Sequence, residues 1–403
     1  MSKLEDLIQK LCPNGVEWKE LGEVCEFQNG YAFKSKMFKK SGEKIIRITN
    51  IVNGKIEFKD VKYFDKNDYS NSSIDNFIVK KDDILIAMSG ATTGKVGINN
   101  TENIAYLNQR VGKFIPNEKI LNNKFLYHYL LLNELVLYNL SGNGSQENLS
   151  TNSIKKLKIP IPPLEIQEEI VHILDSFTEL TNELTNELTA RKKQYEFYRD
   201  SLLTFGDEVD WKKLGDVSEI YDGTHSTPKY VSSGIKFVSV ENIDSLYETN
   251  KFISIDDYNK FRIKPQKNDV LMTRIGSVGK SSVITKDEPL AYYVSLSLIR
   301  VKEKLLPKFI HYYIGSRFFK KELNKRILHT AVPIKINLGD IGKCYIPLPP
   351  LSEQERIVSI LDKFDSLCND ITKGLPAEIE ARKKQYEYYR DKLLTFKDIS
   401  ENK

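Results

Sequence analysis

The stretch ARKKQYEFYRDSLLTF (190–205) returns as ARKKQYEYYRDKLLTF (381–396), with 14 of 16 positions identical. A proline-rich stretch precedes each copy, IPIPPLEIQEEIVHILD at 159–175 and IPLPPLSEQERIVSILD at 346–362. Two matches of this length at nearly the same offset do not arise by chance. The chain therefore contains an internal duplication, and that duplication organises the rest of the sequence.

The segments between these blocks also correspond, although more loosely. A repeat of this length indicates a duplicated pair of domains, because solenoid repeats span only about 20–50 residues. The matching pairs are VEWKELGEVCEFQNG (16–30) with VDWKKLGDVSEIYDG (209–223), KKDDILIAMSGATTGKVG (80–97) with QKNDVLMTRIGSVGKSS (266–282), and FLYHYL (125–130) with FIHYYI (309–314).

The order of the chain is therefore variable, constant, variable, constant. We predict variable domains at 1–158 and 206–345, a central helical spacer at 159–205 and a C-terminal helical spacer at 346–403. Within the variable domains, short β-rich runs such as EKIIRITNI and DVLMTRI alternate with glycine, asparagine and aspartate turns. Each variable domain ends in a helical stretch, around 123–138 and 307–326. The fold class is predicted to be mixed α/β (α+β).

The constant blocks are predicted to be helices that begin after the X-Pro steps, which hold the backbone extended. Apolar residues then recur mostly at alternate steps of three and four, the spacing of a coiled-coil seam. The residues expected to pair the helices are Ile170, Phe177, Leu184, Leu188, Tyr195 and Leu202 in the first block, and Ile357, Phe364, Ile371, Ile379, Tyr386 and Leu393 in the second.

A helix of about 40 residues spans about 60 Å, and a single apolar stripe of that length needs a partner. The other copy is the obvious one, so we expect an antiparallel coiled coil related by a pseudo-two-fold axis. The alternative is that each helix packs on its own domain. Gly374 and Pro376 lie inside the second helix and predict a kink or break there.

Positive charge is confined to the variable domains. Residues 1–158 carry 23 Lys and Arg against 18 Asp and Glu, and residues 206–345 carry 23 against 17, net charges of +5 and +6. The helical blocks at 159–205 and 346–396 are net −5 and −1. Basic surfaces favour phosphate backbones through counterion release. Ordinary solvated lysine faces are the alternative explanation.

Several motifs that would indicate catalysis or metal binding lack the residues or the spacing that such sites need. GATTGK (90–95) and GSVGK (276–280) have three and two residues before Gly-Lys where a phosphate-binding Walker loop needs four, and the first is followed by Val96 in place of Ser or Thr. The IPPL and LPPL prolines lack the Asn or Asp of an adenine methyltransferase tetrad. The five histidines form no ligand cluster. We therefore expect no catalytic residue, no metal and no cofactor.

Targeting features are also missing from the sequence. The start MSKLEDLIQKL is charged and amphipathic, unlike a signal peptide, and no apolar run reaches the length of a membrane span. The four cysteines lie far apart without CxxC spacing. A cytoplasmic protein with no membrane partner is expected.

The arrangement resembles one known family. Two basic variable domains, each followed by a block that opens with IP(I/L)PPL and carries ARKKQYE-x-YRD-x-LLTF, resemble the specificity subunits of type I restriction–modification systems. The resemblance covers nearly the whole chain. It implies that each variable domain recognises one half of a split site in double-stranded DNA, and that the paired helices set the spacing. It also implies two adenine methyltransferase subunits as partners, joined by a translocating nuclease subunit.

One local feature fits this family closely. TELTNELTNELTA (178–190) contains the tetrapeptide T-N-E-L in tandem, and in the family the number of such units tunes the spacer between half-sites. Four residues lengthen a helix by about 6 Å, the rise of one or two base pairs at about 3.4 Å each. An amphipathic low-complexity stretch is the plain alternative. The second block has no such repeat, which puts symmetrical behaviour in doubt.

Candidate DNA contacts are Lys, Arg, Asn, Gln, Ser and Thr side chains in loops that a rigid sheet supports. Arg274 stands where the first domain has Met88. For each residue a solvent-facing role is the alternative. The candidates are Lys34, Lys36, Arg47, Thr92, Thr93, Lys95, Gln109, Arg110, Ser145 and Gln146 in the first domain, and Thr224, His225, Lys229, Arg274, Ser277, Lys280 and Lys335 in the second.

Two other functions remain open at the level of sequence. The chain could serve as the recognition module of a type IIB-like or type IIG-like enzyme, in which the partner both cuts and methylates. It could also be a duplicated coiled-coil scaffold without a DNA role. The predicted function is a non-catalytic, DNA-binding specificity subunit.

Overall fold

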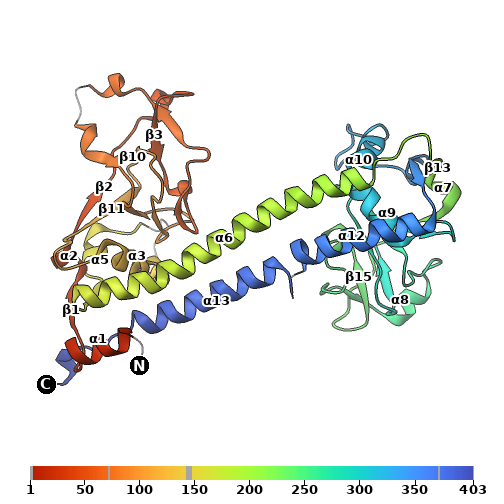
Figure 1. Ribbon diagram of the computed structural model, residues 1–403. Coiled ribbons are helices and arrows are strands. Elements are labelled where there is room, and N and C mark those ends of the chain that lie inside the picture. Colours follow the sequence, from red (N-terminus) through yellow and green to blue (C-terminus); the bar gives the residue numbers. More distant parts are fainter. Residues whose placement is uncertain (1–2, 71–72, 142–147, 371–372, 403) are drawn as a thin grey trace. The chain divides into compact units, whose positions relative to one another are not determined.

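The computed structural model describes residues 3–70, 73–141, 148–370 and 373–402 and divides into two compact units (Figure 1). Unit 1 comprises residues 1–183 and 379–403, and unit 2 comprises residues 184–378. Each unit joins one globular α/β domain to segments of both constant blocks. The mixed α/β fold class is confirmed.

The first constant block forms one helix, α6, over 39 residues (Leu164–Leu202). The second block forms α12 (Leu351–Asn369) and α13 (Leu375–Leu393), so the break expected at Gly374 and Pro376 is confirmed. The backbone N–H of Gly374 donates to the carbonyl of Asp370 at 2.9 Å. A Cβ at Gly374 would lie 2.5 Å from the carbonyl oxygen of Ser366. The chain turns tightly against the end of α12, which requires glycine.

The globular part of unit 1 contains a sheet with strand order β2-β11-β8-β9-β5-β4 and a sheet with order β6-β3-β10-β7. The predicted helical stretch at 123–138 forms α3 and α4, which confirms that prediction. The helices are α1 (Lys3–Leu11), α2 (Leu21–Val24), α3 (Asn123–Leu132), α4 (Glu134–Asn139) and α5 (Thr151–Lys155), and the strands are β1 (Glu17–Glu20), β2 (Cys25–Asn29), β3 (Glu43–Ile46), β4 (Ile51–Val52), β5 (Gly54–Ile56), β6 (Lys62–Phe64), β7 (Ile78–Val79), β8 (Ile84–Ala87), β9 (Val96–Ile98), β10 (Ala105–Leu107), β11 (Val111–Pro116) and β12 (Lys158–Ile161).

The globular part of unit 2 repeats this plan with strand orders β14-β20-β17-β18 and β16-β15-β19. Its β15 pairs with β19 in parallel, as β3 pairs with β10 in unit 1. The helices are α7 (Leu214–Val217), α8 (Ile255–Asn259), α9 (Pro307–Gly315), α10 (Arg317–Asn324) and α11 (Leu338–Gly342), and the strands are β13 (Asp210–Lys213), β14 (Ser218–Asp222), β15 (Ile235–Val238), β16 (Phe252–Ile253), β17 (Val270–Thr273), β18 (Ser281–Val283), β19 (Leu290–Tyr292), β20 (Leu296–Val301) and β21 (Tyr345–Leu348).

A short antiparallel ribbon closes each globular domain just before its helical block. In unit 1, β1 pairs with β12, and in unit 2, β13 pairs with β21. Each ribbon joins the start of a variable segment to the Ile-Pro stretch that follows it. The entry to the long helix is therefore fixed to the domain by backbone hydrogen bonds.

A buried glutamine attaches each helical block to its domain. The Gln167 side chain accepts from the backbone N–H of Asn122 at 2.8 Å and donates to the carbonyls of Ile120 and Pro162. Gln354 repeats these bonds in unit 2, accepting from the N–H of Leu306 at 2.9 Å. Both glutamines are fully buried. The side-chain amide thus satisfies backbone groups that the domain would otherwise bury without partners.

The helices of the two constant blocks lie side by side within each unit (Figure 1). The same aromatic contact joins them in both units. In unit 1, Phe177 of α6 stacks on Tyr389 of α13, with ring centroids 5.2 Å apart. In unit 2, Tyr198 of α6 stacks on Phe364 of α12 at 5.4 Å. Phe177 corresponds to Phe364 and Tyr198 to Tyr389 in the repeat. The same contact therefore occurs in both units with the roles of the two blocks exchanged.

The other predicted pairing residues divide between helix contacts and domain cores. Ile170 and Ile357 are fully buried in clusters that also hold globular-domain residues, and Tyr386, Leu393, Tyr195 and Leu202 pack against the same clusters. Leu184 and Leu188 are half-buried and Ile379 is buried. Ile371 lies outside the described residues.

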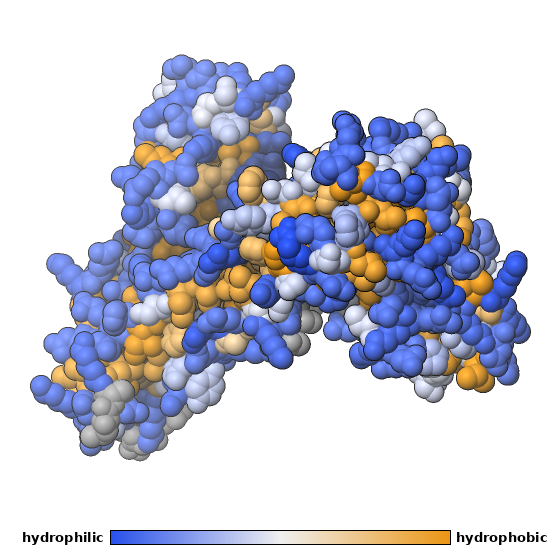
Figure 2. Space-filling view, turned by 45° about the vertical axis from the view of Figure 1, so that its right-hand side comes forward, coloured by the Kyte–Doolittle hydropathy of each residue, from blue (hydrophilic) through white to orange (hydrophobic). Residues whose placement is uncertain are grey.

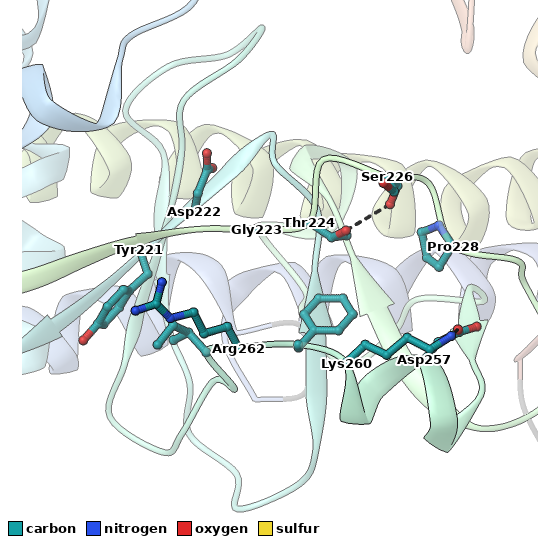
Figure 3. Close-up of a pocket in the computed structure, with 11 residues that line it drawn as sticks. Tyr221, Asp222, Gly223, Thr224, Ser226, Pro228, Asp257, Lys260 and Arg262 are labelled. Carbon is teal, nitrogen blue, oxygen red and sulfur yellow. Dashed lines mark hydrogen bonds and ion pairs between the residues drawn. The ribbon is translucent and has the colours of Figure 1, made fainter.

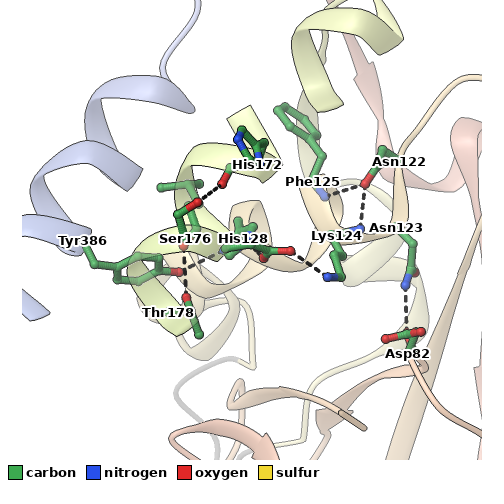
Figure 4. A network of polar contacts seen from close by, with 12 residues as sticks. Asp82, Asn122, Asn123, Lys124, Phe125, His128, His172, Ser176, Thr178 and Tyr386 are labelled. Carbon is green, nitrogen blue, oxygen red and sulfur yellow. Dashed lines mark hydrogen bonds and ion pairs between the residues drawn. The ribbon is translucent and has the colours of Figure 1, made fainter. Parts of the chain in front are cut away.

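A polar network adds to the packing of α13 in unit 1 (Figure 4). His128 of α3 is buried between Asp175 of α6 and Tyr386 of α13, with both ring nitrogens 3.0 Å from their partners. Lys124 donates to the same carboxylate at 2.6 Å. Burial opposes ionisation of Asp175, but the bonds from His128 and Lys124 prevail and lower its pKa. Burial raises the pKa of Tyr386 to about 12, so its hydroxyl stays protonated.

The ends of the described chain meet in unit 1. The N–H of Val16 donates to the carbonyl of Lys397 at 2.9 Å, and the N–H of Ile399 donates to the carbonyl of Val16 at 3.2 Å. Within the described residues, no helix is long and apolar enough to cross a membrane. Hydrophilic residues cover most of the visible surface in Figure 2, with hydrophobic residues gathered in separate patches.

Replacing the buried glutamine with an apolar residue of similar size tests this attachment. Gln167→Met should lower the free energy of unfolding by about 1–3 kcal/mol, because the N–H of Asn122 and two carbonyls lose their partner. Urea unfolding measures the change. Gln194→Met, at a half-exposed position on α6, is the control and should change stability by less than about 0.5 kcal/mol. Equal losses would show that Gln167 contributes nothing beyond an ordinary helix position.

Candidate nucleic-acid interface

A glycine turn joins equivalent strands in the two domains, between β8 and β9 and between β17 and β18. The N–H of Gly94 donates to the carbonyl of Ala87 at 2.9 Å, and that of Gly279 donates to Thr273 at 3.0 Å. Both glycines have positive φ, 82° and 91°. The sequences SGATTGK and IGSVGK are therefore tight turns on a sheet.

In the first domain, segments that hold candidate DNA contacts lie next to this turn. The N–H of Met88 donates to the carbonyl of Arg110 at 2.9 Å, which places residues 108–110 beside the turn. Tyr31 bridges to Asn108, which adds the loop at 30–36. Ser89 bridges to Asn148, the last residue of the loop SGNGSQEN (141–148), which holds the candidates Ser145 and Gln146. Residues Ser145 and Gln146 of that loop lie outside the described residues.

The second domain repeats the cluster with different side chains. The N–H of Val294 donates to the carbonyl of Thr224, and the N–H of Arg274 donates to that of Ser295. Ile275 bridges to Lys335. The loops at 222–229, 273–280 and 329–337 therefore converge on one surface, as they do in the first domain.

A pocket lies next to the loop at 222–229 (Figure 3). Its volume is 810 Å³, and Lys260 and Arg262 line it together with Tyr221, Thr224 and Ser226. Figure 3 shows Tyr221 and Arg262 near one end and Ser226 and Pro228 near the other. Lys260 is ion-paired with Asp257 at 2.7 Å, whereas Arg262 is exposed. Asp222 and Asp257 also line the pocket, so its lining holds two cations and two carboxylates, and Arg262 is a cation that it exposes next to the loop.

Comparisons with known proteins identify the family of this chain. The family profile described as "Type I restriction modification DNA specificity domain" matches residues 13–191 and 207–381. The EcoR124I/EcoR124II specificity subunit of Escherichia coli is 36% identical over 287 residues, which cover 67% of this chain and 70% of that protein. The chain belongs to the type I restriction–modification DNA specificity family.

Further relatives cover nearly the whole chain. S.HindORF215P of Haemophilus influenzae is 31% identical over 405 residues, 94% of this chain and 96% of that protein. The type I restriction–modification S subunit of M. genitalium has the same fold, with a TM-score of 0.58 at 14% identity over 94% of this chain and 96% of that one. A structure of a type I restriction–modification system has a TM-score of 0.61 at 20% identity over 96% and 98%.

Most of the residues predicted to contact DNA in this member of the specificity family are accessible to solvent. Arg47, Thr92 and Thr224 are half-buried, and Lys95 and Lys280 are ion-paired with Glu134 and Asp244. The exposed candidates are Lys34, Lys36, Lys95, Gln109, Arg110, His225, Lys229, Ser277, Lys280 and Lys335.

Thr93 and Arg274 are buried and have partners inside their own domains. The Thr93 hydroxyl donates to the carbonyl of Gly90 at 2.6 Å. The Arg274 guanidinium binds both oxygens of Asp222 and the carbonyls of Val294 and Ile336. With 8% exposure, Arg274 has little surface left for a contact with DNA. Its sequence position beside a turn gave no indication of the carboxylate that lies 52 residues earlier.

Sequence reasoning named Arg47 and Thr92 at this surface but missed Ser89. Arg47 Nε, Ser89 Oγ and Thr92 Oγ1 are buried without a hydrogen-bond partner in the described part of the chain. Such atoms cost about 1–3 kcal/mol each when no ligand or solvent satisfies them. Lys260 and Arg262 were also missed, although the basic run NKFRIK at 259–264 could have indicated a DNA contact there. Among the described residues no His, Cys, Asp and Glu gather as a metal site.

The glycine turn of the first domain should tolerate no side chain. A Cβ at Gly94 would lie 2.8 Å from the backbone nitrogen of Tyr138, at a φ that other residues rarely adopt. Gly94→Ala should therefore lower the free energy of unfolding by about 1–3 kcal/mol, measured by urea unfolding. Gly339→Ala is the control, because a Cβ there meets nothing within 4 Å. Equal stability of the two variants would refute the strain at Gly94.

Proposed function

We propose that each variable domain reads one half of a bipartite site in double-stranded DNA, as the recognition part of a type I restriction–modification complex. The supporting observation is that one loop cluster occurs in both domains on equivalent strands, with different side chains in each. Positive net charge in both domains favours the phosphate backbone. In this proposal residues 1–158 and 206–345 are the target-recognition domains.

Within each cluster, lysines and arginines contact phosphates and the remaining polar side chains contact base edges. The phosphates of the first half-site are contacted by Lys34, Lys36 and Arg110. Those of the second are contacted by Lys229 and Lys335. Arg262 joins the second set because it is exposed beside the loop at 222–229. The chain itself contributes no catalytic group, so partner subunits carry out methylation and cleavage.

The helical blocks at 159–205 and 346–403 act as the spacer in this proposal. The first T-N-E-L unit includes Asn182, whose side-chain oxygen accepts from Lys55 Nζ at 2.6 Å. A globular-domain residue thus contacts the tandem repeat directly. Changing the number of units changes the length of α6 while leaving both loop clusters intact.

Deleting one unit, residues 185–188, tests the spacer and bipartite recognition together. The full chain with its methyltransferase partner is offered a library of randomised duplexes, and the bound fraction is sequenced. The wild-type chain should select two half-sites at a fixed spacing. The deletion should shorten that spacing by one or two base pairs, because α6 loses about 6 Å. The half-site bases should stay the same, and altered bases would contradict the spacer.

The two 16-residue repeats also preserve positions that packing does not explain. Phe197 and the equivalent Tyr388 are 69% and 61% exposed. The identical pairs Lys192 and Lys383, Lys193 and Lys384, and Glu196 and Glu387 are exposed as well. Identity at solvent-facing positions is expected when both copies bind the same partner. We assign this surface to two methyltransferase subunits, one on each repeat, with a translocating nuclease subunit completing the complex.

Exposed aromatic residues commonly dominate the affinity of protein interfaces. The double variant Phe197→Ala, Tyr388→Ala should weaken binding of the methyltransferase subunit at least about tenfold, measured by calorimetry or size-exclusion chromatography. Leu135→Ala, 71% exposed on α4, is the matched control and should bind normally. Normal binding by the double variant would remove this surface from the proposal.

A further inference from the structure

The loop at 222–229 carries a histidine that a carboxylate holds in place. The side chain of His225 is 72% exposed, and its Nε2 lies 2.8 Å from Oδ2 of Asp222. An exposed side chain normally samples several rotamers, but this bond restricts the imidazole. His225 is therefore presented to solvent in a defined orientation.

The carboxylate of Asp222 is itself fixed from inside the domain. Arg274 donates to it in bidentate fashion, from Nε to Oδ1 at 3.1 Å and from the terminal nitrogen to Oδ2 at 2.9 Å. The same guanidinium donates to the carbonyl of Val294 at 3.0 Å and to that of Ile336 at 3.2 Å. Tyr292 donates its hydroxyl to the backbone carbonyl of Asp222 at 2.9 Å.

These contacts tie the converging loops of the second domain to one ion pair. Asp222 lies at the start of the loop 222–229, Arg274 at the glycine turn, and Ile336 at the end of the loop 329–337. Bidentate arginine–carboxylate pairs with little exposure are geometrically specific. Recognition of a base edge requires a precisely positioned side chain, and supporting hydrogen bonds of this kind fix that position.

The hydrogen-bonding groups of His225 can pair with groups on the edge of a base. Because Nε2 carries the proton that it donates to Asp222, neutral His225 has its lone pair on Nδ1. No described residue hydrogen-bonds to Nδ1. In the major groove, such an acceptor matches the amino group of cytosine N4 or adenine N6. Protonation would turn Nδ1 into a donor that matches guanine O6 or N7.

We propose that His225 is a specificity-determining residue for the half-site of the second domain, with Asp222 and Arg274 as its positioning residues. The inference rests on the proposed function of that domain. The first domain has Asn29 and Met88 in place of Asp222 and Arg274, and its loop carries Ala32 where His225 stands. The held histidine is thus specific to the second domain, as two domains that read different half-sites require.

The test measures base preference at each position of the site. The full chain with its methyltransferase partner is again presented with randomised duplexes, now as wild type and as His225→Ala. The variant should lose preference at a single base pair of one half-site by about 5- to 100-fold, with the other half-site and the unfolding temperature unchanged. His172→Ala, an exposed histidine on α6, is the control and should keep every preference.

The positioning residues are tested by the same readout. Asp222→Asn and Arg274→Lys should weaken preference at the same base pair as His225→Ala, whatever their effect on stability. A uniform loss of affinity without a change at that base pair would overturn the positioning role. Unchanged preferences in His225→Ala would overturn the inference while leaving bipartite recognition intact. Failure of the wild-type chain to select two half-sites would instead overturn the proposed function.

Discussion

The structure depends on covering the apolar stripe of α6. A helix of 39 residues with one such stripe is unstable alone in water, because its own hydrogen bonds barely offset the entropy of ordering the chain. The chain meets this constraint by duplication: the early half of α6 packs with α13 and the late half with α12. The reciprocal stacks of Phe177 on Tyr389 and Tyr198 on Phe364 use the same two side chains in both places. The repeated contact requires the same two aromatic positions in both blocks, whereas the domains that the blocks follow differ in sequence.

Inside the globular domains, too, some features are common to both copies and others differ. Strand order, the closing ribbon, the glycine turn and the buried glutamine repeat in both, so the frame that holds the loops is common. The residues on the loops are free to differ because they face solvent and bear little of the packing. Equivalent positions that do not face solvent differ as well, since Met88 packs beside a core and Arg274 anchors a buried ion pair.

Much of the fold followed from the sequence because its signals are local or repeated. The length of α6, the break at Gly374, the helices near 123–138 and 307–326 and the α/β class all came from periodicity, proline and glycine positions, and internal matches. The candidate residues were located from the sequence, whereas the convergence of their loops depends on strand pairing that only the structure reveals. The buried partners of Arg274, the bonds of Gln167 and the pocket beside Arg262 did not follow. Each depends on residues about 40 or more positions apart or on a concave surface, and spacing along one chain carries no such information.

The bonds between Val16 and residues 397–399 have a consequence for biosynthesis. Unit 1 combines residues that are synthesised before unit 2 with residues that are synthesised after it, whereas unit 2 is one continuous segment. Contacts of such long sequence separation form slowly, and only after residues 397–399 have been synthesised. Unit 2 can therefore complete its core during translation, while the first domain waits for α13. Truncated chains released early would lack the partner for the first half of α6 and expose its apolar stripe.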